Sequence, residues 1–235
     1  MERSKQLKIE CKAVLFDMDG VLIDSISHIE RSLRRWASKH HLDPARVVDL
    51  SHGRNDRDVV KLAAPFLDVE REVRRIQEDE VAEAYRIRSK SGAVELVNSL
   101  RSNSWAVVTS GCRAVAEARL RAAGVSAPPV LVSADDVTLG KPAPEGYLSA
   151  ARQIGVSPDN CVVFEDAPAG VKAARDAGMQ VVGVTGTVSR EYLFCDHIIS
   201  DLSEVMAVNT ECAIELHFRL VDRPRAVHDH DSAKT

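Results

Sequence analysis

Residues 13–25 read AVLFDMDGVLIDS, an apolar run that is followed at once by two acids and a glycine. The run Ala13–Phe16 predicts a short buried strand, and Asp17 and Asp19 stand where this strand ends. Residues two apart in an extended chain project to the same side, and such carboxylates repel each other unless a cation or a shared proton lies between them. The stretch therefore predicts either a divalent-metal site or a turn in which an aspartate makes local hydrogen bonds before Gly20.

Similar apolar runs recur along the chain and alternate with segments that have the pattern of helices. The expected strands are Ala13–Phe16, Trp105–Thr109, Val130–Val132, Cys161–Phe164, Val181–Thr185 and His197–Ile199. A glycine follows each of the clearest helices, which are Ala114–Ala123, Pro144–Gln153 and Gly170–Ala177. This alternation is typical of a parallel sheet covered by helices, so we expect an α/β fold with a doubly wound, Rossmann-like parallel sheet as its core.

The interval from Ser25 to Lys90 interrupts this alternation. It contains no strand signal, and apolar residues recur at helical spacing, for example at Ile26, Ile29 and Leu33. We expect residues 25–90 to form an inserted α-helical cap domain, with residues 1–24 and 91–235 forming the core. Because the insertion follows the first strand directly, it would lie over the sheet edge where ligands bind in open α/β folds, and act as a lid.

The signal weakens after Ser203. Residues Ile214–Leu220 alternate between apolar and polar, which predicts a half-buried strand. From Arg223 onward we expect disorder. The stretch His228–Asp231, which reads HDHD, has residue types that bind metals, but we interpret it as part of a disordered tail.

Composition excludes several classes of protein. The chain has 235 residues and a formal charge of −4, with bases interleaved among acids, so nucleic acid is not an expected partner. The five cysteines are far apart and form no CxxC pair, which argues against a disulfide framework and a structural zinc site. No apolar stretch is long enough to span a bilayer, and the N-terminus lacks a signal peptide's apolar region. We expect a cytoplasmic protein without a membrane partner, either monomeric or weakly dimeric.

Polar residues also follow the second and third expected strands. Thr109, Ser110 and Gly111 supply a hydroxyl and backbone N–H groups that can bind an anion, and the alternative is a threonine that is only a strand residue or helix cap, followed by a glycine turn. Lys141 lies between a glycine and a proline, in a stiff segment where its ammonium can neutralise phosphoryl oxygens or an aspartate. The alternative for Lys141 is an ordinary exposed lysine.

Two acids, Glu165 and Asp166, follow the fourth expected strand. They complete a set of hard oxygen ligands of the kind that magnesium prefers, and the alternative is a pair of solvated acids in a turn. Each of the four motifs has such an alternative. Their occurrence in order at the ends of four strands of one sheet favours a single site.

With these four motifs in place, the sequence resembles the haloacid dehalogenase superfamily. Its DxDG motif, its second-motif Thr or Ser, its third-motif Lys and its fourth-motif acidic pair match the residues described above. The resemblance spans roughly Lys12 to Thr185, and the segments GKPAPEGYL and VVFEDAPAGVKAARDAGM resemble the branch with a helical cap between the first two motifs. Within that branch, SHGRNDRD, WAVVTSG and KPAPEGYL are most similar to sugar- and polyol-phosphate phosphatases, including glycerol-3-phosphate and 2-deoxyglucose-6-phosphate phosphatases.

The resemblance implies a two-step hydrolysis of a small-molecule phosphate monoester. Asp17 would attack phosphorus and form an aspartyl phosphate, and Asp19 would act first as acid and then as base. Thr109 and Lys141 would complete the phosphate cradle, with Lys141 also paired with Asp17.

The resemblance also implies the ligands. Magnesium would be held at Asp17, at the backbone carbonyl of Asp19, and at the fourth-motif acids Asp166 and Glu165. Ser110 and Gly111 would bind the substrate. In the cap, the loop His52-Gly53-Arg54-Asn55 is the candidate specificity segment, and Arg54 is expected to bind a substrate hydroxyl or oxyanion unless it is only a surface arginine at a helix start.

The sequence disfavours three other functions. Dehalogenases generally lack the second aspartate, so Asp19 argues against that activity. β-Phosphoglucomutases carry a cap histidine where ungapped alignment places Ile29, and His28 is adjacent but out of phase, which disfavours a mutase without excluding it. A catalytically silent sugar-phosphate-binding protein would not need an acid beside the nucleophile.

Overall fold

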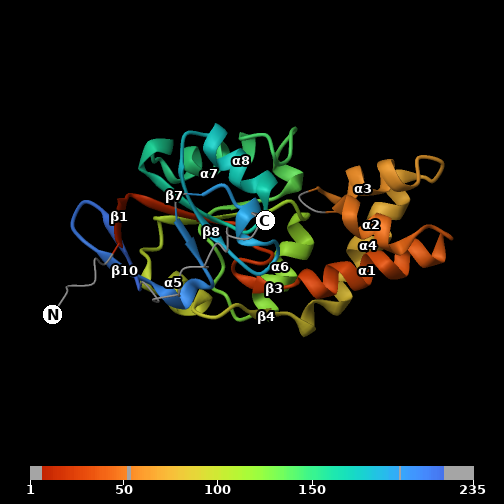
Figure 1. Cartoon of the computed structure of the whole chain (residues 1–235), viewed down its shortest axis with the longest axis horizontal. Coiled ribbons are helices and arrows are strands. Elements are labelled where there is room, and N and C mark those ends of the chain that lie inside the picture. The colour runs from red at the N-terminus through yellow and green to blue at the C-terminus, as the bar shows by residue number, and fades with distance from the viewer. Residues whose placement is uncertain (1–6, 52–53, 196, 220–235) are drawn as a thin grey trace, which may run out of the picture.

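A six-stranded parallel sheet forms the centre of the protein, in a computed structural model that describes residues 7–51, 54–195 and 197–219 (Figure 1). The strand order is β6-β5-β2-β7-β8-β9. These strands are β2 (Ala13–Phe16), β5 (Trp105–Val108), β6 (Leu131–Val132), β7 (Cys161–Glu165), β8 (Gln180–Val184) and β9 (His197–Ile199). The chain builds outward from β2 in both directions, as in a doubly wound sheet, so the predicted α/β fold is confirmed.

Helices bury both faces of this sheet. Val14 and Phe16 of β2 face one hydrophobic cluster, while Ala13 and Leu15 face the other, because side chains alternate along a strand. The first cluster includes α5 (Ala93–Ser99) and α6 (Arg113–Ala122), and the second includes α7 (Glu145–Ile154) and α8 (Pro168–Asp176). A sheet covered on both faces requires strands that are apolar throughout, which explains why the sequence signal of these strands is strong.

The predicted helix ends are also present. Gly124, Gly155 and Gly178 follow α6, α7 and α8 with φ of 72°, 80° and 77°. Only glycine adopts this left-handed conformation without steric cost, so each of these residues stops its helix within about two residues of the predicted end.

An additional antiparallel sheet lies at the end of the core that is farther from the cap helices (Figure 1). Its order is β1-β11-β10, with β1 at Leu7–Cys11, β10 at Val205–Asn209 and β11 at Ile214–Phe218. Strand β11 confirms the alternating pattern seen in the sequence, whereas β1 and β10 were not predicted. The expected disorder from residue 223 and the HDHD stretch lie outside the described residues.

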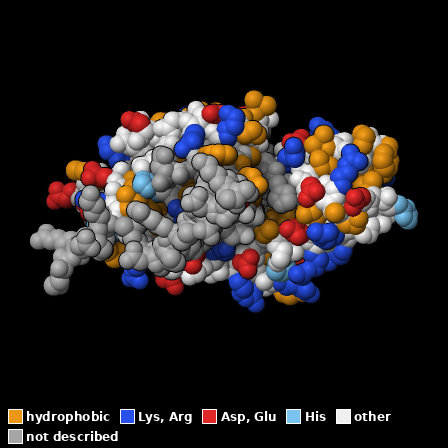
Figure 2. All heavy atoms as spheres, viewed as in Figure 1, with side chains coloured by type: hydrophobic (Ala, Val, Ile, Leu, Met, Phe, Trp, Pro, Cys, Tyr) orange, Lys and Arg blue, Asp and Glu red, His pale blue; other side chains and the backbone are white. Residues whose placement is uncertain are grey.

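Four helices between β3 (Ile23–Asp24) and β4 (Arg88–Ser89) form the lobe on the right of Figure 1. They are α1 (Ile26–Lys39), α2 (Pro44–Ser51), α3 (Asp56–Ala63) and α4 (Val69–Glu83), followed by a 3-10 turn at Ala84–Arg86. Their apolar faces meet in a hydrophobic cluster separate from those of the sheet, which includes Leu33, Trp36 and Ile76. On the face drawn in Figure 2, acidic and basic side chains are interspersed over this lobe.

The expectation that Ser25–Lys90 holds no strand was wrong. Arg88–Ser89 (β4) pairs antiparallel with Ile23–Asp24 (β3), so the two chain segments that connect core and lobe form a short ribbon. Strands of two residues contain no periodicity, which is why the sequence pattern missed them. We propose that the cap begins and ends at this ribbon, near the expected boundaries at residues 25 and 90.

The described residues also bear on the cysteines and on membrane spanning. All five cysteines are present as free thiols, with Cys11, Cys112 and Cys161 buried. Within the described part of the chain, every helix is too short or too polar to cross a bilayer.

A buried carboxylate connects two helices of the cap. Glu72 of α4 accepts hydrogen bonds from Trp36 Nε1 at 3.2 Å and His40 Nε2 at 2.9 Å, and it pairs with Arg75 at 3.1 Å and Arg71 at 3.3 Å. Burial opposes the charged form of Glu72. The hydrogen bond from Trp36 and the interactions with His40 and Arg71 outweigh burial and hold the pKa of Glu72 below its ordinary value.

We predict that Glu72→Gln lowers the free energy of unfolding by about 1–3 kcal/mol at pH 7, because it weakens the charge-assisted bonds that this buried carboxylate accepts. A carboxylate whose pKa is lowered by folding stabilises the protein above its ordinary pKa of 4.5 and loses that contribution as the pH falls through the folded-state value. The difference between wild type and variant, measured by urea unfolding, should therefore shrink below pH 4.5. Glu78→Gln, at an exposed position of the same helix, is the control; an equal effect of both variants would contradict the prediction.

Candidate active site

The predicted site residues of the core lie together at the carboxyl edge of the parallel sheet. They line one cavity of about 390 Å³, whose walls include Asp17, Asp19, Thr109, Ser110, Gly111, Lys141, Glu165 and Asp166. The cap contributes to the same cavity through α1, α3 and α4. In an open α/β sheet the strand ends beside the reversal of strand order form the usual ligand site, and the ends of β2, β5 and β7 are neighbours here.

Three buried acids line the cavity side by side. Asp17, Glu165 and Asp166 are 8%, 1% and 2% exposed, and one oxygen of each lies within 4.8 Å of the others. Burial and the charge of Glu165 raise the pKa of Asp166 to about 7. Three carboxylates so close and so dry favour a bound cation, because only positive charge offsets their repulsion and desolvation.

Lys141 supplies one such charge. Its Nζ is paired with Asp17, lies 2.7 Å from Glu165 Oε1 and donates to the carbonyl oxygen of Val108 at 3.1 Å. It also lies 5.0 Å from the centre of the Tyr147 ring. Burial disfavours its charge, but Asp17 and Glu165 raise the pKa of Lys141 well above its ordinary value. Lys141 is therefore a fixed cation beside Asp17, in the pairing that the sequence led us to expect.

Both oxygens of Glu165 are hydrogen-bonded. Oε1 accepts from Lys141 and from the Tyr147 hydroxyl at 3.0 Å, and Oε2 accepts from the backbone N–H groups of Asp166 at 2.9 Å and Ala167 at 3.0 Å. Tyr147 was not predicted, because a tyrosine on the apolar face of a helix looks like an ordinary core residue. Gly170 was also missed: a Cβ atom there would lie 1.5 Å from Glu165 Oε1.

The second motif forms a tight turn at the end of β5. The Gly111 N–H donates to Thr109 Oγ1 at 3.1 Å, and Thr109 is buried. Helix α6 begins two residues later, at Arg113. The turn brings the Ser110 and Gly111 backbone to the cavity wall, where N–H groups and a helix N-terminus favour an anion.

The Asp19 carboxylate has partners of its own, outside the group of three acids. Its Oδ1 accepts from Ser25 Oγ at 2.5 Å and from Arg119 Nη1 at 2.9 Å. The intervening Gly20 has φ of 85°, and a Cβ atom there would lie 1.9 Å from Asp166 Oδ2. The glycine of the first motif is therefore needed for both its backbone conformation and its close contact with the fourth motif.

The sequence did not point to a second group of charged residues that lines this cavity. Arg119 of α6 is 4% exposed and pairs with Asp19 and, at 3.0 Å, with Glu80 of the cap. Burial raises the pKa of Glu80 to about 8, and it raises the pKa of nearby Asp56. An arginine on an amphipathic helix gives no sequence signal of burial, so only the tertiary structure identifies it.

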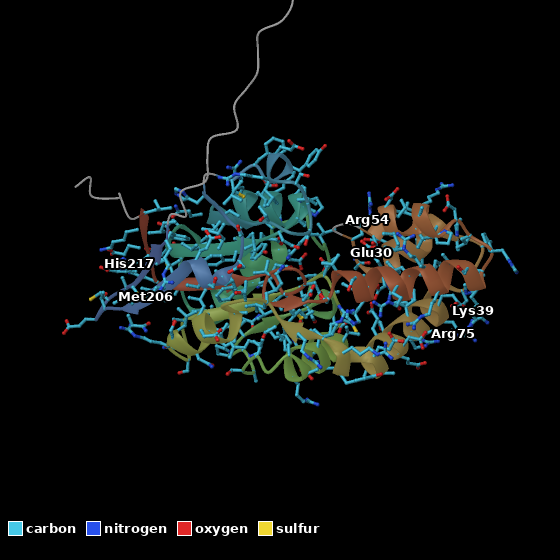
Figure 3. All side chains as sticks on the ribbon, turned by 60° about the horizontal axis from the view of Figure 1, so that its bottom comes forward. Glu30, Lys39, Arg54, Arg75, Met206 and His217 are labelled. Atoms are coloured by element: carbon cyan, nitrogen blue, oxygen red, sulfur yellow. The ribbon has the colours of Figure 1, made fainter. Side chains whose placement is uncertain are left out.

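The cap loop expected to read the substrate is described in part. His52 and Gly53 lie outside the described residues. Arg54 lines the main cavity, is exposed and donates to the Leu50 carbonyl at 2.8 Å, while the Asn55 side chain caps α3 by accepting from an N–H of its first turn. Figure 3 shows Arg54 and Glu30 at the end of the cap nearest the core, and Lys39 and Arg75 at the far end.

A fold and site of this kind define a hydrolase of the haloacid dehalogenase-like class, and the chain belongs to that family. It matches the family described as haloacid dehalogenase-like hydrolase over residues 11–178, which contain all four motifs.

Relatives with more specific names are found among characterised proteins. The chain is 39% identical over 184 residues to hexitol phosphatase A of Escherichia coli K12, covering 75% of this chain and 84% of the relative. It is 34% identical over 214 residues to glycerol-1-phosphate phosphohydrolase 2 of Saccharomyces cerevisiae, covering 84% and 85%. Among solved structures, CbbY of Rhodobacter sphaeroides in complex with phosphate aligns with a TM-score of 0.71 at 24% identity, over 83% of this chain and 96% of that one, which supports the fold.

We predict that Gly170→Ala lowers turnover at least about 100-fold, because the added methyl group would displace Glu165 from Lys141, and misplaced catalytic groups commonly cost about this much. The substitution should leave the fold intact, since alanine is favoured within a helix. Phosphatase assays and circular dichroism on Gly170→Ala check both points. Lys172→Ala, at an exposed position of the same helix, is the control, and a fully active Gly170→Ala enzyme would show that the close contact is unimportant.

Proposed function

We propose that this hydrolase is a magnesium-dependent phosphatase that removes phosphate from a small phosphorylated sugar or polyol through an aspartyl-phosphate intermediate. The observation that carries the proposal is the buried Asp17, held at the end of β2 by Lys141 and flanked by two further acids. The sugar- and polyol-phosphate names of the two relatives support the substrate class.

In the first step, a carboxylate oxygen of Asp17 attacks phosphorus, and the bond from phosphorus to the ester oxygen breaks. Asp19 gives its proton to the departing alcohol. Lys141 holds Asp17 in place and neutralises charge on the transferring group, while the turn Thr109-Ser110-Gly111 donates hydrogen bonds to its oxygens.

In the second step, water attacks the phosphorus of the aspartyl phosphate. Asp19, now ionised, takes a proton from this water, and the bond from phosphorus to the Asp17 oxygen breaks. Inorganic phosphate leaves, Asp17 is again a carboxylate and Asp19 is again protonated. Splitting one hydrolysis into two displacements lowers the barrier of each.

The acidic residues fit a magnesium ion, because Mg²⁺ prefers a few carboxylate oxygens completed by water and substrate phosphate. The carboxylates of Asp17 and Asp166 and the backbone carbonyl of Asp19 would hold it. The bound ion would neutralise the phosphoryl oxygens. Glu165 was also expected to bind the metal; because its oxygens already accept four hydrogen bonds, we propose that it mainly positions Lys141 and the loop after β7.

The size and lining of the cavities beside the motif residues support a small polar substrate. A second cavity of about 370 Å³ shares with the first the core residues Thr109, Ser110 and Lys141 and the cap residues Asn55 and Asp56. Phosphate is common to all candidate substrates, so discrimination among alcohols must come from groups outside the phosphate cradle. We propose that the loop His52-Gly53-Arg54-Asn55 contributes this discrimination.

The phosphosugar mutase is the second candidate function. Ile29 lines the cavity, whereas His28 is not among the described residues that do. A mutase needs a polar group to move a proton on the bound sugar, so an isoleucine at this wall favours hydrolysis. Product analysis separates the two functions, because a phosphatase releases inorganic phosphate and a mutase yields an isomeric sugar phosphate.

We predict that Asp17→Asn abolishes hydrolysis across a panel of sugar, polyol and short-acid phosphates, with a loss of about 10³ or more and a retained fold. The amide is a poor nucleophile and cannot form the aspartyl phosphate. Phosphate release is the measurement. Asp24→Asn, which changes the exposed last residue of β3, is the control. An Asp17→Asn enzyme with appreciable activity would remove Asp17 as the nucleophile, and a wild type that binds phosphate esters without releasing phosphate would favour the silent binding protein.

We also predict that activity disappears in EDTA and returns with Mg²⁺, because the three acids would otherwise repel the phosphate dianion. Calcium should bind and support little turnover, since its looser coordination misplaces the nucleophile. Binding is followed by the rise in melting temperature with added Mg²⁺, which Asp166→Asn should reduce. Undiminished activity in chelator would refute the metal assignment.

A further inference from the structure

Arg119 is a buried cation that joins the core to the cap. It lies on α6 and is 4% exposed. Its Nη1 lies 2.9 Å from Asp19 Oδ1, and its Nη2 lies 3.0 Å from Glu80 Oε1, on α4 of the cap. Neither the family motifs nor the proposed mechanism uses Arg119 or Glu80.

The planar guanidinium fixes both partners at once. Its two terminal nitrogens are held at a constant separation, so a carboxylate bound to each has a defined position relative to the other. Arg119 and Asp19 are 100 residues apart in sequence, and Glu80 is 39 residues from Arg119. Three elements, the loop after β2, α6 and α4, therefore meet at a single side chain.

Two hydrogen bonds from described residues reach the Asp19 carboxylate, and both fall on the same oxygen. Both Arg119 Nη1 and Ser25 Oγ bind Oδ1, and this leaves Oδ2 as the oxygen that can meet the substrate. A proton shared with a leaving alcohol must travel along a short, aligned hydrogen bond, so the orientation of the Asp19 carboxyl group affects the rate directly.

The surroundings of Arg119 are acidic. Asp19, Asp56 and Glu80 all act on its charge, and burial otherwise disfavours it. Removal of this guanidinium would leave the carboxyl groups of three residues on the walls of the same cavity without this cation, so the contact is more than a surface ion pair. Arg119, Glu80, Asp56 and Asp19 all line the walls of the main cavity, next to the space for the leaving group.

We infer that Arg119 is a positioning residue for the proton donor: it fixes Asp19 through Oδ1, is itself fixed by Glu80 of the cap, and presents Asp19 Oδ2 to the leaving alcohol. This inference rests on the proposed phosphatase function. The cap thus contributes to proton transfer through Glu80, in addition to any contact with the substrate.

The test uses the dependence of the rate on the leaving group. Aryl phosphates such as p-nitrophenyl phosphate lose a stable anion and need little protonation, whereas glycerol phosphate loses a basic alkoxide and needs a proton. The ratio kcat/KM reports the steps up to departure of the leaving group, so it isolates the acid role of Asp19.

We expect Arg119→Lys to lower kcat/KM for glycerol phosphate about tenfold or more. This loss is part of the roughly 10²–10⁴-fold rate increase that a positioned proton donor supplies. The loss for p-nitrophenyl phosphate should be less than about threefold, because that step depends little on protonation.

Control variants make the result decisive. Arg121→Lys changes an exposed arginine of the same helix and should alter neither substrate. Glu80→Gln keeps the size of the side chain but cannot ionise opposite Arg119, and above the Glu80 pKa of about 8 we expect the same selective loss with smaller magnitude. Circular dichroism and thermal melting establish folding first, and Glu80→Gln carries the test if Arg119→Lys does not fold.

Equal losses for both substrates in these variants would overturn the inference, because a purely structural role does not distinguish leaving groups. A selective loss in Arg119→Lys with none in Glu80→Gln would overturn the contribution of the cap. Asp19→Asn is the reference. If it is not selective for the alkyl ester, the assignment of Asp19 as the acid fails, and with it the proposed mechanism, which is a different outcome from failure at Arg119.

Discussion

Lys141 places one positive charge between Asp17 and Glu165, and the rest of the site is arranged around that contact. The parallel register pairs Phe16 with Phe164, so the next residues along β2 and β7 are the two acids. The sheet itself therefore brings like charges together in a dry environment, which is strongly unfavourable unless they are compensated. The ammonium group, and a metal ion in the proposed function, provide that compensation.

The supporting residues follow from this constraint. Tyr147 and two backbone N–H groups complete the hydrogen bonds of Glu165, and Gly170 leaves room for its carboxylate. On the other side of the cavity, Arg119 compensates a second set of acids. The site thus consists of two buried cations, each shared by carboxylates from different elements, and the fold determines which carboxylate each one meets.

The features that could be predicted from the sequence are those that a local pattern of residues encodes. The parallel strands, the helices that end at glycines and the four motif positions at strand ends all depend on residues close together in the chain. The sequence did not predict Arg119, because an arginine on an amphipathic helix is usually exposed and its partner Asp19 is 100 residues away. It also missed the ribbon Ile23–Asp24 with Arg88–Ser89, whose two-residue strands form only because distant segments meet. Pairing between distant segments is a property of the tertiary structure and leaves little trace in a single sequence.

That ribbon has an evolutionary consequence. Because the chain leaves and re-enters the core at adjacent points, the whole segment between them is topologically equivalent to a surface loop. Its length and sequence can change without altering the order or register of the parallel strands. Duplicated genes can therefore diverge in the helical lobe while the parallel sheet and its motif residues are inherited intact, provided that the lobe keeps a partner for Arg119 such as Glu80. Chimaeras that exchange the lobe at Asp24 and Arg88 should join at compatible backbone positions. Insertion at a paired ribbon makes one catalytic core available to many leaving groups.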